Sequence, residues 1–287
     1  MPTRSINVTH VSQVAVIWLN RPDVRNAIDG VMVRELDATL AALETDRSVR
    51  AVVLAGVGPV FCAGIDVRWM KRMAGSSLAV NTRDALGMAR LLHRLDCMPM
   101  PTLARVHGAA YAGALGIIAA CDIAVASLEA EFCVSETRLG LAAMTIAPYL
   151  VRAIGERQAR RYVLSGEAFT AAEAYRIGLV HELAPQDELD ARINGILGHL
   201  MLGSPKALPA AKEVIAQLTE DPESKDHISA AASQLAKMRA SGEAKEGISA
   251  FLEKRRPSWV RQGIPAIKQQ DPLDPATQTR QPGPKRS

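Results

Sequence analysis

The sequence predicts an α/β protein in which alternating strands and helices are followed by a helical C-terminal region. Two β-branched or apolar runs, Val14 to Leu19 and Ala51 to Leu54, flank a segment whose apolar residues recur every three or four positions. The same alternation returns between Thr102 and Ala126, and only helical patterns are expected beyond Met144. Such alternation is typical of layered α/β folds.

The first helix is expected between the two N-terminal strands. Val33, Leu36, Leu40 and Leu43 would form its apolar face, because residues three and four apart share one side of a helix. Asp29 stands where an N-cap is needed, since a short polar side chain can accept hydrogen bonds from the free N–H groups of the first turn.

The second alternation begins after two prolines, Pro99 and Pro101. Thr102 to Val106 is predicted to be a buried strand, Gly113 to Ala120 a helix of small residues, and Ile123 to Ala126 a further strand. Each of these strands is followed by a loop at its C-terminal end.

The chain divides by pattern into residues 1–200, 201–256 and 257–287. The first part is the predicted core and the second a helical region. The last part is rich in proline among glutamine, aspartate and lysine, which leaves little to pack, so we expect an irregular tail draped over the body.

Composition excludes several classes of protein. With 287 residues and 48% hydrophobic content, the chain can bury a full core. Its apolar stretches are shorter than the roughly 20 residues that a membrane-spanning helix needs, so no membrane partner is expected. The N-terminus lacks a secretory pattern, and Cys62, Cys97, Cys121 and Cys133 show no zinc-site pairing, which favours a cytoplasmic protein with reduced thiols and no metal.

Nucleic acid is not an expected partner. Aromatic residues make up only 4% of the chain and offer few stacking platforms for bases. The net charge of +4 is concentrated near the C-terminus, where a solvated tail accounts for most of it.

The first candidate site is a loop, Gly56 to Asp66, that directly follows a predicted strand. Ligands collect at the C-terminal ends of strands in layered α/β proteins, and the small residues Ala63 and Gly64 let backbone N–H groups approach a ligand. Asp66 is expected to cap a helix that runs through Met73. A tight turn with no ligand is the alternative.

The second candidate site, His107 to Gly116, also follows a strand and opens a helix. A helix N-terminus presents unpaired N–H groups and partial positive charge. Two such loops facing each other would offer two backbone donors to one oxygen, as is needed where negative charge develops on a carbonyl. Close helix packing through small residues is the alternative.

The third candidate site is Glu136, within the apolar stretch Phe132 to Gly140. A carboxyl group in such surroundings can have a raised pKa and exchange protons near neutral pH. The alternative is a surface pair between Glu136 and Arg138.

These three places together resemble the crotonase (enoyl-CoA hydratase/isomerase) family in order, spacing and residue type. Phe61-Cys-Ala-Gly-Ile-Asp66 is similar to that family's first oxyanion-hole loop, and His107-Gly with Gly113 is similar to the second. Asn20 to Ala27 resembles the segment along coenzyme A, and Ser135-Glu-Thr-Arg-Leu-Gly140 resembles the catalytic-glutamate turn. The likeness covers roughly residues 5 to 255.

The resemblance implies a crotonase (ClpP/crotonase) fold, with a core of repeated β-β-α turns in a superhelix and a helical C-terminal region. It also implies a homotrimer or dimer of trimers that acts on an acyl-CoA substrate and needs no cofactor. The amides of Ala63 and Gly113 would hold the thioester oxygen, and Glu136 would move the proton. The residues implied to bind coenzyme A are Arg25, Ala63, Gly64, Ile65, Asp66 and Gly113.

One departure from the family pattern bears on the reaction. Enoyl-CoA hydratases commonly carry a second glutamate where this chain has Gly116. A single acid suits a double-bond isomerase as well as a hydratase. The residues after Asp66 and around Glu136 nevertheless resemble those of a bacterial subgroup of methylglutaconyl-CoA or related terpenoid acyl-CoA hydratases. We therefore rank hydratase first and isomerase second.

Two further alternatives stay open at this point. The missing acid is compatible with a catalytically weak member that binds acyl-CoA without turnover. A nucleophilic hydrolase is less favoured, because His107 and Ser135 are present but no nucleophile-elbow motif is.

Overall fold

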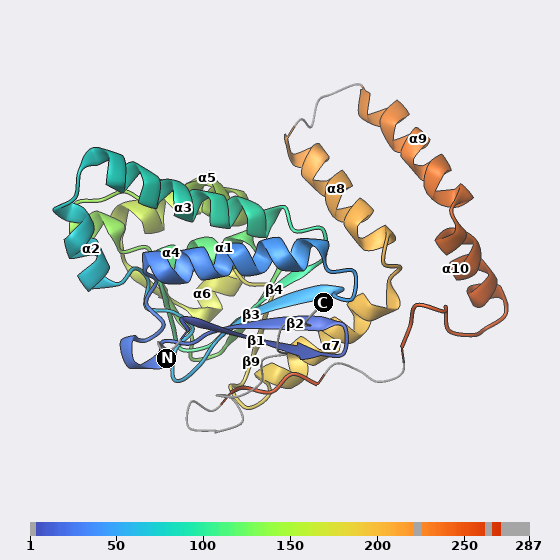
Figure 1. Ribbon diagram of the computed structural model, residues 1–287, viewed down its shortest axis with the longest axis horizontal. Helices are drawn as coiled ribbons and strands as arrows, with labels where there is room; N and C mark the ends of the chain where they lie inside the picture. Colours follow the sequence, from blue (N-terminus) through green and yellow to red (C-terminus); the bar gives the residue numbers. More distant parts are fainter. Residues whose placement is uncertain (1–3, 221–225, 262–265, 271–287) are drawn as a thin grey trace, which may run out of the picture.

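The main body of the protein is a sheet covered by helices on both faces (Figure 1). The computed structural model describes residues 4–220, 226–261 and 266–270. Within these residues six strands form the main sheet in the order β1-β2-β3-β4-β6-β9, and every neighbouring pair except β1 and β2 is parallel. The bounds are β1 (Ile6–Val11), β2 (Val14–Leu19), β3 (Ala51–Gly56), β4 (Thr102–Val106), β6 (Ile123–Ser127) and β9 (Glu182–Ala184).

A smaller sheet stands at the C-terminal ends of the main strands. In the described part of the chain it consists of β5 (Ala109–Tyr111), β7 (Glu131–Cys133) and β8 (Ala168–Thr170), with β5 and β7 parallel and β7 and β8 antiparallel. Because β5 follows β4 and β7 follows β6, this sheet carries the loops in which ligands collect in such folds.

The helices connect these strands and then leave the body. Those of the core are α1 (Gly30–Thr45), α2 (Val67–Ala74), α3 (Leu78–Asp96), α4 (Gly113–Ala120), α5 (Ala147–Ser165), α6 (Ala171–Arg176) and α7 (Leu189–Leu202). Two short 3-10 helices are η1 (Pro22–Val24) and η2 (Glu136–Leu139). The last helices are α8 (Ala207–Glu220), α9 (Asp226–Ala240) and α10 (Gly242–Leu252).

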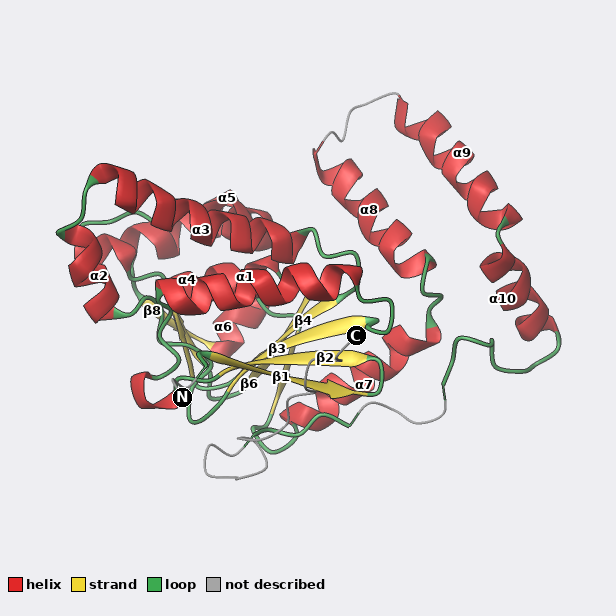
Figure 2. Ribbon diagram, in the orientation of Figure 1, coloured by secondary structure: helices red, strands yellow, loops and turns green. Residues whose placement is uncertain are grey.

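Strand β2 shows how the sheet builds two cores. Its residues alternate in direction, as pleating requires. Ala15, Ile17 and Leu19 pack with the apolar side chains of α1, α3 and α4. Val14, Val16 and Trp18 pack on the other face with α7 and Ile267. Helices lie on both sides of the sheet (Figure 2). Both faces of β2 are therefore buried, which explains why the strand is an unbroken apolar run.

Helices α8, α9 and α10 project from the body as an arm (Figure 1). An ion pair of 2.8 Å between Lys212 of α8 and Asp122 holds the base of the arm, and Asp122 also accepts from the amide and hydroxyl of Thr102. None of the helices in the described residues is long and apolar enough to cross a bilayer.

The α/β class is confirmed, as are the first helix with its Asp29 cap and the strand bounds at 14–19 and 102–106. The expectation of helices alone beyond Met144 is wrong, because β8 and β9 form there. Each is only three residues long, which is too short to show a period, and each is stabilised by a strand distant in sequence. Most of the predicted tail, 257–287, lies outside the described residues.

Candidate active site

The two glycine-rich loops lie side by side. The amide of Phe61 donates to the carbonyl of His107 at 2.7 Å, the amide of Cys62 donates to Ala109 at 3.1 Å, and the amide of Tyr111 donates back to Cys62 at 3.0 Å. These bonds extend the pairing of β5 onto the first loop. The loops that sequence reasoning placed at two separate strand ends therefore form one surface.

Gly64 allows this close approach. Its φ of +90° is disfavoured for any residue with a side chain, and a Cβ here would lie 2.9 Å from the carbonyl oxygen of Tyr111. The second loop passes that near to the first because position 64 has no side chain.

The backbone amides of this surface that lack an acceptor among the described residues include those of Ile65 and Gly113. Gly113 opens α4, so its amide has no intrahelical acceptor. The loops bring the two residues together, since a Cβ on Gly113 would lie 3.2 Å from Cδ1 of Ile65.

The amide of Ala63, expected as the first donor, is already used. It donates to the carbonyl of Arg25 at 2.9 Å. That hydrogen bond joins the 20–27 segment to the loop. The amide of Ile65, two residues after Ala63, remains unpaired. The structure thus differs from the expectation for Ala63, and the unpaired amide belongs instead to Ile65, which the resemblance implied only for coenzyme A contact.

Glu136 lies next to this surface at the start of η2. Cys133, three residues earlier, accepts a hydrogen bond of 2.8 Å from the amide of Ala112, the residue before Gly113. The Glu136 Oε2 atom is buried and has no hydrogen-bond partner in the described structure. Burial raises the pKa of this carboxyl group above its ordinary value, partly offset by a hydrogen bond to the backbone.

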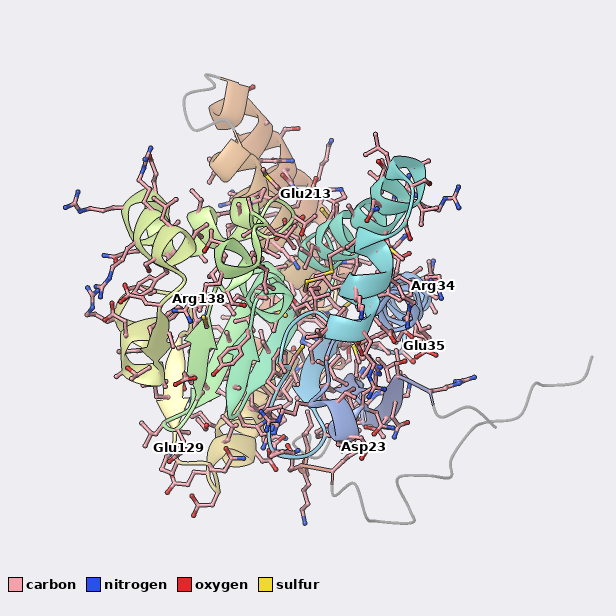
Figure 3. All side chains as sticks on the ribbon, turned by 90° about the vertical axis from the view of Figure 1, so that its left-hand side faces the viewer. Asp23, Arg34, Glu35, Glu129, Arg138 and Glu213 are labelled. Carbon is pink, nitrogen blue, oxygen red and sulfur yellow. The ribbon has the colours of Figure 1, made fainter. Side chains whose placement is uncertain are left out.

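The alternative of a surface pair between Glu136 and Arg138 is not observed. Arg138 is exposed, and no ion pair joins it to Glu136 in the part of the chain that the structure describes. Its Nε instead lies near Gly166, after the end of α5. Figure 3 views the molecule from the left-hand side of Figure 1 and shows Arg138 above and to the left of Asp23 of η1.

The position of the missing second acid is filled by an apolar side chain. A Cβ on Gly116 would collide with Cγ2 of Ile146 and would lie 2.9 Å from its Cβ and 3.2 Å from Cδ1 of Leu92. Ile146 is almost completely buried at the start of α5. The backbone as folded therefore has no room for a carboxylate at position 116.

Asp66 is buried and serves the fold. Its carboxylate accepts from the amides of Arg68 and Trp69, which caps α2 as expected, and forms an ion pair of 3.0 Å with Arg21. Burial raises the pKa of this carboxyl, but these bonds outweigh burial and the net shift is downward. Arg21 also pairs at 3.2 Å with Asp29, so one guanidinium joins the caps of two helices.

The Cys62 thiol and the His107 ring are buried and are not placed as a nucleophile and its base. Burial raises the pKa of the Cys62 thiol to about 12, which makes it a poor nucleophile at neutral pH. Burial lowers the pKa of His107 to about 4, and the ring bonds the carbonyl of Gly58 at 2.8 Å. No cluster of three or more metal-ligating side chains occurs among the residues described.

Sequence reasoning missed three features that matter here: the unpaired amide of Ile65, Ile146 as the side chain opposite Gly116, and Arg21 as the bridge between caps. No local signal marks Ile146 or Arg21. Ile65 directly follows Gly64, and a glycine in a loop after a strand is the signal for close approach of the backbone.

Comparison with known proteins identifies the family of this chain. A family model described as enoyl-CoA hydratase/isomerase matches residues 9–262. The 2,3-dehydroadipyl-CoA hydratase of Escherichia coli is 31% identical over 88% of this chain and 97% of its own. The mevalonyl-coenzyme A hydratase sidH of Aspergillus fumigatus is 32% identical, covering 86% and 91%.

The structural comparison extends this to the fold. A crystal structure of an enoyl-CoA hydratase from Shewanella pealeana superimposes with a TM-score of 0.86 at 36% identity, covering 89% of this chain and 96% of that one. With a family model over most of the chain and relatives above 30% identity along nearly their whole length, this chain belongs to the enoyl-CoA hydratase/isomerase (crotonase) family of enzymes.

Proposed function

We propose that this enzyme adds water to the double bond of an enoyl-CoA thioester, with Ile65 and Gly113 as the oxyanion donors and Glu136 as its single acid–base group. The observation that carries the proposal is the buried, unpartnered Oε2 of Glu136, three residues after Cys133, whose carbonyl accepts from the amide next to Gly113. A buried polar atom without a partner is costly, so such groups are concentrated at sites that await a ligand.

The two amides would stabilise the negative charge that develops on the thioester oxygen. Water attacks the β-carbon, and the electrons of the double bond move onto the carbonyl as an enolate. Each donor of this kind typically contributes about a hundredfold to a thousandfold in rate.

Glu136 would carry the proton through the whole cycle. As a carboxylate it accepts a proton from the attacking water, and as an acid it delivers that proton to the α-carbon when the enolate collapses. The raised pKa suits both roles, because a group that gives and takes a proton works best near the ambient pH.

A panel of enoyl-CoA thioesters tests the proposal, with hydration followed by loss of enoyl absorbance and double-bond migration by product analysis. Hydration should fall by roughly a hundredfold to ten-thousandfold in Glu136→Gln, while binding of coenzyme A persists. Glu129→Gln, on the exposed turn before β7, is the control and should leave the rate unchanged. Wild-type protein that binds coenzyme A but turns over none of the panel would overturn the proposal in favour of a binding protein.

Double-bond isomerisation is the second candidate, and the blocked position at Gly116 favours it. In that reaction Glu136 removes a proton from the α-carbon and returns it to the γ-carbon, and one carboxylate is enough. The panel separates the two reactions, because isomerisation incorporates no oxygen from labelled water.

For coenzyme A, we propose contacts with Arg25 and with the 63–66 loop backbone. The Arg25 side chain is exposed and is not part of an ion pair in the described structure, so it is available to a phosphate. Asp66 is already occupied by α2 and Arg21, and we therefore expect it to shape the loop rather than touch the ligand. No cofactor is required by this scheme.

The acyl group is proposed to be branched or of the methylglutaconyl type. The name of the mevalonyl-coenzyme A hydratase relative supports such a group. The side chains around Gly113 and Gly116 are apolar: Ile28, Ile65, Met88, Leu92 and Ile146. A charged end of the acyl chain would therefore have to lie away from these residues.

We also propose a homotrimer or dimer of trimers in the cytoplasm. The projecting arm carries exposed apolar side chains, among them Leu235, Phe251 and Leu252, and apolar patches of this kind are typical of interfaces. No disulfide joins the cysteines in the described structure, and a reducing compartment would keep them as thiols. Light scattering that gives a stable monomer would contradict the assembly.

A further inference from the structure

Residues 266–270 lie beyond the family match, which ends at residue 262, and they pack against the base of the active-site loop. Ile267 is buried among Val14, Val16 and Trp18 on the α7 face of the main sheet. We call residues 266–270 the strap.

The strap is held in place by α7. Asn194 donates to the carbonyl of Ile267 at 3.0 Å and accepts from its amide at 2.9 Å, so one side chain satisfies both backbone groups. The amide of Gln269 donates to Asp190 at 2.7 Å. A buried apolar anchor with three hydrogen bonds fixes the strap in position.

From this position Gln269 reaches the turn that leads into the oxyanion loop. Its Nε2 donates to the carbonyl of Gly56 at 2.9 Å, where β3 ends and the turn of residues 56–61 begins. The Gln269 Oε1 is buried with no donor among the described residues, so the bond to Gly56 is the polar contact of this side chain.

A second chain of contacts reaches the same turn from the strap. Asp190 pairs at 2.5 Å with Arg105, which is almost fully buried, and Arg105 lies 3.2 Å from Nδ1 of His107. The other ring nitrogen of His107 bonds the carbonyl of Gly58 at 2.8 Å. Because Arg105 can only donate, Nδ1 is the acceptor and Nε2 carries the proton toward Gly58.

We infer that the strap is a positioning element for catalysis, in which Gln269 directly and Asp190 through Arg105 and His107 hold the 56–61 turn and thereby set the position of the Ile65 amide. The inference rests on the proposed oxyanion role of Ile65. A donor must lie at hydrogen-bonding distance from the oxyanion, and small displacements of such groups cost rate.

The test compares Gln269→Met with Gln270→Ala in the full-length protein. Methionine keeps the size of the side chain but cannot donate to Gly56. Gln270 is the control, since it is the adjacent residue of the same type and its side-chain oxygen accepts from Asn7 of β1 rather than contacting Gly56. Asn194→Ala removes the hydrogen bonds to both backbone groups of Ile267, and this second variant should therefore also weaken the hold of the strap on the turn.

Two measurements are made on each variant. Hydrogen exchange of the peptides covering 56–66 should accelerate roughly tenfold in Gln269→Met and Asn194→Ala, but not in Gln270→Ala. The kcat for the best thioester should fall by roughly threefold to tenfold in the same two variants, with KM changed less than twofold. A purely structural strap would instead lower the fraction of folded protein and leave the kcat per folded molecule unchanged.

The exchange measurement does not depend on turnover, which separates the inference from the proposed function. If exchange in 56–66 is the same in Gln269→Met as in wild type, the strap does not hold the turn and the inference is overturned, even if hydration proceeds. If exchange accelerates in a protein that turns over no thioester, the proposed function fails and the contact between strap and turn stands.

Discussion

Ile146 occupies the space that a side chain at Gly116 would need. The two residues are thirty positions apart, on α4 and at the start of α5, and the absence of a side chain on one permits the burial of the other. A side chain at position 116 is thus excluded by packing, and a carboxylate there does not fit the backbone as folded. Glu136 is left as the single acid of the proposed site, and burial raises its pKa.

The packing of Ile146 against Gly116 predicts a specific coupling in stability. Gly116→Ala should lower the free energy of unfolding by roughly 1–3 kcal/mol, because the new methyl group overpacks the contact with Ile146. In the Ile146→Ala background the same change should cost much less, so the double-mutant cycle should be non-additive. Denaturant unfolding measures both.

Gly195→Ala is the control for this cycle. Gly195 lies within α7, and a Cβ there would meet no atom within 4 Å. This change should be neutral or slightly stabilising, since alanine is the better helix former. Equal effects at positions 116 and 195 would refute the packing argument.

The raised pKa of Glu136 predicts the pH dependence of the rate. The carboxylate is the form that accepts the proton of water, so kcat/KM should rise with pH through a pKa above the ordinary glutamate range and then level off. The residual activity of Glu136→Gln should lack this rise. If kcat/KM instead rises at the ordinary pKa of an exposed glutamate, Glu136 is solvated in the free enzyme.

The same pKa shift predicts that Glu136→Gln is more stable than wild type at neutral pH. A folded-state pKa above the unfolded value means that ionisation destabilises the fold, so wild-type stability falls as pH rises through that window. Glutamine removes the buried charge. We expect Tm to rise by roughly 2 °C at pH 7 to 8, with the difference shrinking below the ordinary pKa, as measured by thermal unfolding.

Gly64→Ala should impair catalysis strongly. The new Cβ would strain a residue with φ of +90° and press on the carbonyl of Tyr111, which separates the two loops that carry the oxyanion donors. We expect kcat to fall by about a hundredfold or more. Gly75→Ala is the matched control, because its Cβ would make only an ordinary contact of 3.7 Å, and steady-state kinetics of both variants would show whether the loss is specific.

Arg21→Met should destabilise the fold by roughly 2 kcal/mol, because it leaves the partly buried carboxylates of Asp66 and Asp29 without their cation. The lowered pKa of Asp66 contributes stability above the ordinary aspartate pKa, which is lost as pH falls through the folded value. The difference from wild type should therefore shrink in acid. Arg34→Met, an exposed change on α1, should stay within about 0.5 kcal/mol in the same unfolding experiment.

The sequence by itself determined the α/β class, the strand ends that carry the two loops, the caps Asp29 and Asp66, and Glu136 as the candidate acid. These features follow from local signals: apolar period, capping residues, and glycine after a strand. Even the family resemblance rests on short motifs of this kind.

Only the tertiary structure decided which amides are unpaired, what fills the place of the second acid, and where the chain returns to the active-site loop. Ala63 gives way to Ile65 because Arg25, distant in sequence, accepts the first amide. Ile146 meets Gly116, and Gln269 meets Gly56, through the packing of separate helices and strands. Contacts between residues far apart in the chain depend on how the layers stack, and no local pattern encodes that.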